Sequence, residues 1–194
     1  MNIHTTISAM NPKITPQKES FLKEIVKFTL IAVAIVIPVR LFIAQPFIVS
    51  GASMDPTFST GQYLIVDQVS YRFEDPSRDD VIIFKYPRDP ETFFIKRIIG
   101  LPGETLKVVD GQVTIINNEH PEGLVLTESF ISEKHKTYET FNVTLGDDEY
   151  FVMGDNRAQS SDSRAWGPLE EKYIVGRPLV RLLPTSKISV FPGK

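Results

Sequence analysis

Residues 48–58 read Ile-Val-Ser-Gly-Ala-Ser-Met-Asp-Pro-Thr-Phe, and they directly follow the only long apolar segment of the chain. Gly51 and Ala52 are small, so another segment can approach closely here, and Pro56 stiffens the residues that follow. A serine among such residues is usually part of a turn. The position of Ser53 beside an apolar segment raises a second hypothesis, a nucleophilic serine held at a membrane surface.

The apolar segment runs from Phe28 to Val39, resumes after Arg40 and continues to Val49. A membrane-spanning helix needs about 20 residues, and residues 25–45 meet that length. Arg40 then lies near the end of the span, where its long side chain reaches the interface and avoids the cost of a charge in mid-bilayer. The pattern predicts a transmembrane helix.

The apolar segment has two other interpretations, a buried core helix and a cleaved signal peptide. A core helix is disfavoured because charged residues flank a run that has no polar face. The small residues Ser50-Gly51-Ala52 resemble a signal-peptide cleavage site. The run is long for a signal peptide, however, and Arg40 and Gln45 separate it from that site.

Four lysines between residues 13 and 27 precede the apolar segment, where acidic residues are few. Such positive charge marks the cytoplasmic side of a membrane. We therefore expect residues 1–24 to form a cytoplasmic tail and residues 25–45 the single transmembrane helix of a cell-membrane protein. Residues 46–194 would form an extracytoplasmic domain.

The composition limits the chemistry of that domain. With 194 residues, 42% of them hydrophobic and 23% charged, the chain is long and apolar enough for one globular domain. Its net charge of -3 gives no reason to expect a nucleic-acid partner. It has no cysteine, which excludes disulfides and thiolate nucleophiles. Its three histidines show no metal-ligand spacing, so we expect no metal and no cofactor.

Beyond Phe58 the pattern changes to that of β-strands. Short runs rich in Val, Ile, Phe and Tyr are separated by turn residues, and Asp110-Gly111 is a strong hairpin signal. Residues 119–140 are polar and weakly patterned, which indicates an insertion or extended loop. We expect a mainly β fold, an antiparallel sheet or folded barrel that follows the transmembrane helix. The predicted strands are 63–69, 81–86, 93–99, 105–109, 112–117, 149–153 and 173–183.

A nucleophilic serine needs a base within hydrogen-bond reach. His4 lies in the expected tail, and His120 and His135 lie in the weakly patterned segment, so a Ser-His-Asp triad is disfavoured. Arginine is excluded because it does not lose its proton in proteins. Lysine serves only where burial lowers its pKa from about 10.4 toward neutrality.

Two lysines fit that requirement. On a strand over residues 93–99, Lys96 shares its face with Phe94 and Ile98, where an ammonium group is desolvated. Lys85, in the apolar run Val-Ile-Ile-Phe-Lys-Tyr, meets the same requirement almost equally well. The ordinary interpretation of either is a lysine whose amine reaches solvent at a sheet edge. The pattern alone leaves the choice open.

A third segment, Met153–Gly167, is dense in short hydrogen-bonding side chains and contains the only tryptophan. Its ordinary interpretation is a polar turn capped by Asx and serine interactions. Asp155 and Asp162 could form ion pairs with Arg157 and Arg164, or the two carboxylates could form a weak cation site. Elaborate polar loops are also typical of functional sites.

Together the three segments resemble bacterial type I signal peptidase, the membrane-bound Ser/Lys protease of peptidase family S26 that removes signal peptides. The resemblance extends from the apolar segment to about Pro184, in the same order of motifs. The residues that carry it are Ser53-Met-Asp-Pro-Thr57, Lys96-Arg-Ile-Ile-Gly-Leu-Pro-Gly-Glu104 and Gly154-Asp-Asn-Arg157 through Arg164, with 63–69 and 79–86 between them.

The resemblance implies a mechanism. Ser53 would attack the scissile carbonyl, and neutral Lys96 would take its proton and later activate the deacylating water. That role decides between the two candidate lysines. Ser160 would orient the lysine amine, and Asp162 and Arg164 would hold the loop in shape.

The resemblance also implies how partners bind. A secretory preprotein would add as an extended strand beside the sheet. Ile48, Ser50, Phe94 and Ile95 would line shallow pockets that select small side chains at two alternate positions. The apolar outer surface would contact membrane lipid, and we expect a monomer.

One position departs from part of the family. Some members have a serine two residues before the nucleophile, which helps to stabilise the oxyanion, and Gly51 stands there in this chain. The oxyanion hole near Gly51 would then depend on the Ser53 backbone N–H and on a second donor, a backbone group or water. Losing one such donor costs on the order of 3 kcal/mol.

The sequence thus predicts a membrane-anchored serine endopeptidase that removes signal peptides from secreted preproteins. One alternative is a membrane-tethered β domain that binds extended peptides without cleaving them. Another is a self-cleaving regulator with a related domain, which is disfavoured because residues 1–50 contain no helix-turn-helix pattern. Because Ser50-Gly51-Ala52 resembles a cleavage site, trimming of the chain at its own nucleophile is a further hypothesis.

Overall fold

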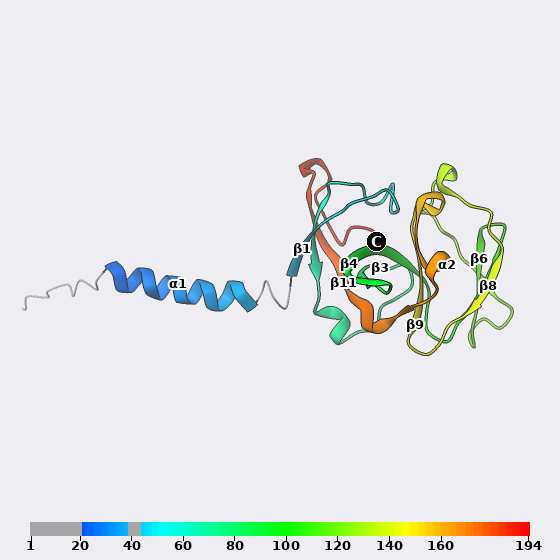
Figure 1. The fold of residues 1–194 in the computed structure, drawn as a ribbon, viewed down its shortest axis with the longest axis horizontal. Coiled ribbons are helices and arrows are strands. Elements are labelled where there is room, and N and C mark those ends of the chain that lie inside the picture. Colours follow the sequence, from blue (N-terminus) through cyan, green and yellow to red (C-terminus); the bar gives the residue numbers. More distant parts are fainter. Residues whose placement is uncertain (1–20, 39–43) are drawn as a thin grey trace, which may run out of the picture. The chain divides into compact units, whose positions relative to one another are not determined.

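The computed structural model of the chain describes residues 21–38 and 44–194 (Figure 1). They belong to two compact units, one that ends at Pro38 and one that extends from Val39 to Lys194. The first contains helix α1, and the second contains all the strands described below.

Helix α1 spans Phe21–Pro38 and carries three charged residues, Lys23, Glu24 and Lys27. Among residues 21–38 and 44–194, no helix is long and apolar enough to cross a membrane. The helix predicted over residues 25–45 therefore differs from the observed one. Residues 39–43 lie outside the described part of the chain, and Ala44 and Gln45 belong to a strand because their backbone pairs with Asp67 and Val66.

Eight strands form the larger sheet, in the order β1-β2-β11-β3-β4-β9-β10, with β12 paired to β11. Neighbouring strands are antiparallel, and β11 lies first beside β3 and then beside β2. The strands are β1 Ala44–Ile48, β2 Tyr63–Asp67, β3 Val81–Tyr86, β4 Asp89–Gly100, β9 Glu149–Met153, β10 Leu169–Glu170, β11 Ile174–Leu183 and β12 Ser189–Val190.

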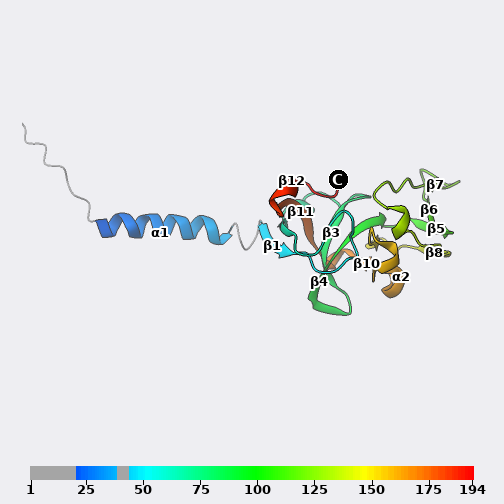
Figure 2. The same ribbon diagram turned by 90° about the horizontal axis from the view of Figure 1, so that it is seen from above.

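Four strands form a second antiparallel sheet in the order β7-β6-β5-β8. Figures 1 and 2 both show it at the end of the strand-containing unit that is farthest from β1. The strands are β5 Thr105–Val109, β6 Gln112–Ile116, β7 Leu124–Val125 and β8 Phe141–Thr144. The short helices of the unit are α2 Ser163–Trp166 and the 3-10 turns η2 Ser70–Arg72, η3 Glu133–His135, η4 Arg157–Gln159, η5 Glu171–Tyr173 and η6 Thr185–Lys187.

The predicted mainly β, antiparallel class is confirmed. Strands 81–86, 105–109 and 149–153 match the predicted residues. The hairpin signal is also confirmed, because Asp110 and Gly111 join β5 to β6 with positive φ angles of 50° and 78°, as a two-residue hairpin turn requires. The segment 119–140 is not merely an extended loop, since it contains β7 and η3.

Three buried apolar clusters hold these elements together. One of them lies under residues 48–58 and contains Val49, Met54, Phe58, Leu64 and Val81. Met54 and Phe58 are 1% and 0% exposed, and fully burying one such side chain contributes roughly 1.5–3 kcal/mol. Burial of these two residues therefore holds the turn that contains Ser53 against the sheet.

Candidate active site

Ser53 lies in the turn that follows β1. Val49 continues the pairing of β1 and β2 beyond Ile48, because its N–H donates to Gln62 O at 2.9 Å and its carbonyl accepts from Gly61 N–H at 2.9 Å. The Asp55 N–H then donates to Ala52 O at 3.1 Å and closes the turn around the serine. A side chain at this position is presented at the end of a rigid strand.

Lys96 lies within β4, between β3 and β9, and is only 4% exposed. Its Nζ donates to Ser53 Oγ at 2.9 Å and to Ile95 O at 3.0 Å. The Phe94 ring lies on the same side, with its centroid 5.0 Å from Nζ. The structure thus brings together the serine and one of the two candidate lysines.

The surroundings of Lys96 change its protonation. Burial lowers the pKa of Lys96 to about 8, although the negative charges of Asp162 and Asp155 act in the opposite direction. Lys85, by contrast, is exposed on β3, opposite Phe93. The chemical requirement for a lysine base, a desolvated amine near a serine hydroxyl, is therefore met at Lys96 and not at Lys85.

The segment after β9 lies against the serine turn. The Asn156 N–H donates to Ser53 O at 3.0 Å. A Cβ placed on Gly154 would overlap Ser53 O and Ser160 Oγ, so only glycine permits this close approach. Because β9 pairs directly with β4, the same segment is also anchored to the strand that carries Lys96.

Asp162 organises this segment. It is fully buried, and its carboxylate accepts from Gly154 N–H at 3.0 Å and from the Arg164 guanidinium at 2.8 Å. It also caps α2 by accepting the Arg164 N–H. Burial acts to raise the pKa of Asp162, but the hydrogen bonds from Arg164 and Gly154 outweigh it and hold that pKa below its usual value. Asp162 thus joins the residue after β9 to α2, and the role of Asp162 and Arg164 in holding the loop in shape stays a prediction.

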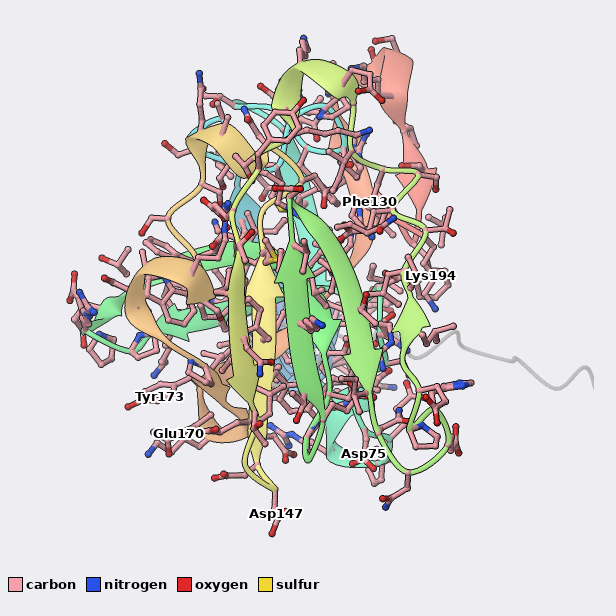
Figure 3. The ribbon with its side chains drawn as sticks, turned by 90° about the vertical axis from the view of Figure 1, so that its right-hand side faces the viewer. Asp75, Phe130, Asp147, Glu170, Tyr173 and Lys194 are labelled. Atoms are coloured by element: carbon pink, nitrogen blue, oxygen red, sulfur yellow. The ribbon has the colours of Figure 1, made fainter. Side chains whose placement is uncertain are left out.

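Arg97, next to Lys96, binds a different set of groups. Its guanidinium pairs with Asp155 at 2.9 and 2.7 Å, donates to Asp79 O and Gly193 O at 2.7 Å, and lies 4.0 Å from the Phe130 ring centroid. Figure 3 shows Phe130 and Lys194 on the same side of the unit.

The pairing in the Met153–Gly167 segment differs in part from the sequence alternatives. Asp155 pairs with Arg97, whereas Arg157 pairs with Glu128. Asp162 pairs with Arg164, as the ion-pair alternative supposed. Arginines thus occupy both carboxylates that the cation-site alternative would have used.

Ser160 lies close to the serine turn, but it does not contact the amine of Lys96 through a hydrogen bond. Its Oγ is buried and, among the described residues, has no hydrogen-bond partner by distance and angle. The Ser160 hydroxyl is nevertheless close enough to Asp162 to favour the ionised form of that carboxylate. The role of Ser160 in orienting Lys96 stays a prediction.

A cavity of about 290 Å³ opens beside Ser53 and Lys96. All four residues predicted to bind substrate line it, namely Ile48, Ser50, Phe94 and Ile95. The cavity also includes residues that the sequence analysis did not single out. They are Phe47, Leu64, Ile83, Phe93, Gln159 and Ser161.

Gly51 also lines the cavity, and its backbone has a positive φ of 99°. Its N–H donates to Thr60 Oγ1 at 3.0 Å, and the same hydroxyl donates back to Gly51 O at 3.0 Å. The Gly51 N–H is therefore already engaged in a hydrogen bond within the turn. The Ser53 N–H, in contrast, donates to no acceptor among the described residues.

A serine hydroxyl that accepts a hydrogen bond from a buried amine of lowered pKa, beside an open cavity, is the arrangement of a serine hydrolase. The comparisons with known proteins agree. The sequence profile of the family described as signal peptidase, peptidase S26, matches residues 22–183. The chain belongs to this family and is a serine endopeptidase.

Individual relatives cover most of the chain. A probable signal peptidase I-1 from Synechocystis is 36% identical over 179 residues, which are 89% of this chain and 88% of that protein. Signal peptidase I V from Bacillus subtilis is 38% identical over 155 residues, 75% of this chain and 90% of that protein. A crystal structure of a signal peptidase I from Enterococcus faecalis is 31% identical and covers 54% of this chain and 97% of its own, with a TM-score of 0.45.

Proposed function

We propose that this protein removes N-terminal signal peptides from secretory preproteins, with Ser53 as nucleophile and Lys96 as general base. One observation carries the proposal, the 2.9 Å hydrogen bond between Lys96 Nζ and Ser53 Oγ at a lysine whose pKa burial lowers to about 8. The names of the relatives, signal peptidase I, support the choice of substrate.

In the proposed mechanism, neutral Lys96 takes the proton of Ser53 Oγ as that oxygen attacks the scissile carbonyl. The Ser53 N–H donates to the oxyanion, and the protonated lysine then gives its proton to the leaving amine. A water molecule, activated by the same lysine, hydrolyses the acyl-enzyme. Ser160 keeps the lysine amine aligned, and Asp162 and Arg164 keep the loop in place.

The preprotein binds as an extended strand along the cavity. Ile48, Ser50, Phe94 and Ile95 contact alternate side chains of that strand, because successive side chains of a strand point in opposite directions. The limited volume of about 290 Å³, shared between two side chains, supports selection of small residues.

Attachment to a membrane through the residues before β1, with the N-terminus in the cytoplasm, forms the second part of the proposal. It is supported by the lysines that precede the apolar segment and by the exposure of apolar side chains along α1, such as Phe28, Ile31 and Ile35. Extraction of isolated membranes with alkaline carbonate tests it. Recovery of the full chain in the soluble fraction would contradict it.

The decisive experiment incubates the detergent-solubilised full chain with one preprotein and identifies the products by mass spectrometry. We expect cleavage by the wild-type protein and by Lys85→Ala, and none by Ser53→Ala or Lys96→Ala, with circular dichroism spectra unchanged. A peptide-binding domain without activity would give intact preprotein in every case. Cleavage by Ser53→Ala would refute the assignment of the nucleophile.

A further inference from the structure

A single residue, Asn156, contacts the peptide groups on both sides of Ser53. Its backbone N–H donates to Ser53 O at 3.0 Å, and its side-chain Nδ2 donates to Ala52 O at 3.1 Å. Asn156 is only 3% exposed, so water does not compete strongly for these two acceptors. The opposite orientation of its amide would place two oxygen atoms face to face, and the donating orientation is therefore the favourable one.

These two contacts determine the direction of the Ser53 N–H. A peptide group is planar, and in its trans form the C=O and N–H bonds point in opposite directions. The bond between Ala52 and Ser53 is trans. Holding Ala52 O therefore restrains the direction of the Ser53 N–H, and holding Ser53 O restrains the next peptide plane. Together the two contacts limit the range of both backbone angles of Ser53.

The Ser53 N–H is the donor for which this direction matters. It donates to no acceptor among the described residues, whereas the N–H of Gly51 is bound to Thr60 Oγ1. Gly51 has no side chain that could assist. An oxyanion formed next to Ser53 Oγ therefore depends strongly on this one backbone group, and such a donor is effective only when it is aimed in advance.

Within the turn, the Asp55 N–H also donates to Ala52 O at 3.1 Å. Burial of Met54 and Phe58 holds the following residues of the turn against the sheet. Asn156 connects the backbone of Ser53 itself to the neighbouring strands, because it follows β9, and β9 pairs with β4 through Arg97 and Met153. Asn156 thus holds the nucleophile in place relative to the strand that carries Lys96.

We propose that Asn156 is a positioning residue for the reaction, which holds the backbone of Ser53 so that its N–H faces the developing oxyanion. The inference rests on the proposed function of Ser53. Asn156 acts through Ser53 and does not itself touch the substrate.

The test compares two ligands of the same peptide sequence, one ending in an aldehyde and one in the corresponding alcohol. With the aldehyde, Ser53 Oγ bonds to the carbonyl carbon while its proton passes to Lys96, and the negative charge rests on the former carbonyl oxygen. The alcohol occupies the cavity without forming this oxyanion. The difference between the two affinities therefore reports formation of the bond to Ser53 and of its oxyanion, separately from the non-covalent fit of the peptide.

We expect Asn156→Ala to weaken aldehyde binding and lower kcat by about 100-fold, the scale of a small misplacement of a reacting group. Alcohol affinity and KM should remain within about twofold, since the cavity itself is unchanged. The pH at which kcat is half-maximal should not move, because Lys96 is untouched. Asn117→Ala serves as control, because it removes a side-chain amide that lies away from the site. That amide donates a hydrogen bond of 2.8 Å to Glu104.

Equal losses for aldehyde and alcohol, or a lower melting temperature with unchanged kcat, would show that Asn156 is only structural and overturn the proposal. A shifted pH profile would show that it acts through Lys96 and also overturn it. If Asn156→Ala does not fold, the near-isosteric Asn156→Leu, which removes the side-chain N–H donors without adding a charge, gives the same decision. A wild-type protein that does not bind the aldehyde at all would instead refute the proposed function.

Discussion

Lys96 and Arg97 are consecutive residues of β4, yet their charged groups serve opposite purposes. Among the described residues, the Lys96 amine donates hydrogen bonds to the hydroxyl of Ser53 and to a backbone carbonyl but to no carboxylate, and burial lowers its pKa to about 8. The Arg97 guanidinium is equally buried but is paired with Asp155 through two hydrogen bonds. A strand that alternates its side chains thus places a cation that can lose its proton beside one that cannot.

The first prediction concerns the pH dependence of cleavage. Since the neutral amine of Lys96 is the active form and its pKa is about 8, kcat/KM should rise about tenfold between pH 7 and pH 9 and then level off. Initial rates on a preprotein-derived peptide check this, with Ser53→Ala as the baseline. A flat profile, or a midpoint near the usual lysine value, would contradict the role of Lys96.

The second prediction is that Lys96→Met stabilises the fold while it abolishes activity. The pKa of Lys96 is lowered in the folded state, so the unfolded chain binds more protons between about pH 8 and 10.5, and the free energy of unfolding rises through that window. Below it, burial of the ammonium costs up to about 3 kcal/mol. Lys96→Met should therefore raise the free energy of unfolding at pH 7 more than at pH 10.5.

Urea denaturation at the two pH values measures that difference. Lys85→Met is the matched control, because Lys85 is exposed on the neighbouring strand β3, and it should change the free energy of unfolding little at either pH. A Lys96→Met variant that is less stable at pH 7 would mean that the ammonium is better compensated than its contacts indicate.

The third prediction concerns the buried pair of Arg97 and Asp155. Asp155→Ala leaves the Arg97 guanidinium buried without its carboxylate, and breaking such a pair costs about 3–5 kcal/mol. Thr57 also loses the acceptor of its hydroxyl. Thermal unfolding should show a large loss of stability. Glu170→Ala breaks only the exposed pair with Lys172 and should leave the melting temperature nearly unchanged (Glu170 is labelled in Figure 3).

The fourth prediction is that Gly154→Ala impairs both stability and catalysis. A Cβ at this position would overlap Ser53 O, a backbone atom that can move only with the whole serine turn. We expect kcat to fall by about 10-fold or more and the melting temperature to drop. Gly146→Ala is the control, because its Cβ would meet only the side chain of Glu149, at 3.3 Å. Normal kinetics in Gly154→Ala would show that the turn adjusts freely.

Much of the fold could be predicted because its signals are local. Strands β3, β5 and β9 are short apolar runs between turn residues, and Asp110-Gly111 specifies its hairpin by backbone angle alone. Strand β1 was missed because Ala44–Ile48 continues an apolar run, and hydropathy does not reveal where a chain begins to pair with a strand distant in sequence.

The candidate site could be predicted only in part. Burial of Lys96 followed from strand alternation, but the same pattern applied to Lys85, and the choice needed either a family resemblance or the fold. The contacts of Asn156 with Ala52 and Ser53 join residues more than a hundred positions apart. They depend on how β9 lies beside β4, for which no local pattern exists.

The pairing of β1 with β2 has a mechanical consequence. Five residue pairs, from Ala44 with Asp67 to Ile48 with Tyr63, connect these strands before the chain reaches the serine turn. A force applied to the chain ahead of Ala44 pulls on this ladder and can displace Ser53 only after the ladder has opened. While the ladder holds, motion of the chain before β1 is not transmitted to Ser53. The distance between the nucleophile and the base therefore stays the same.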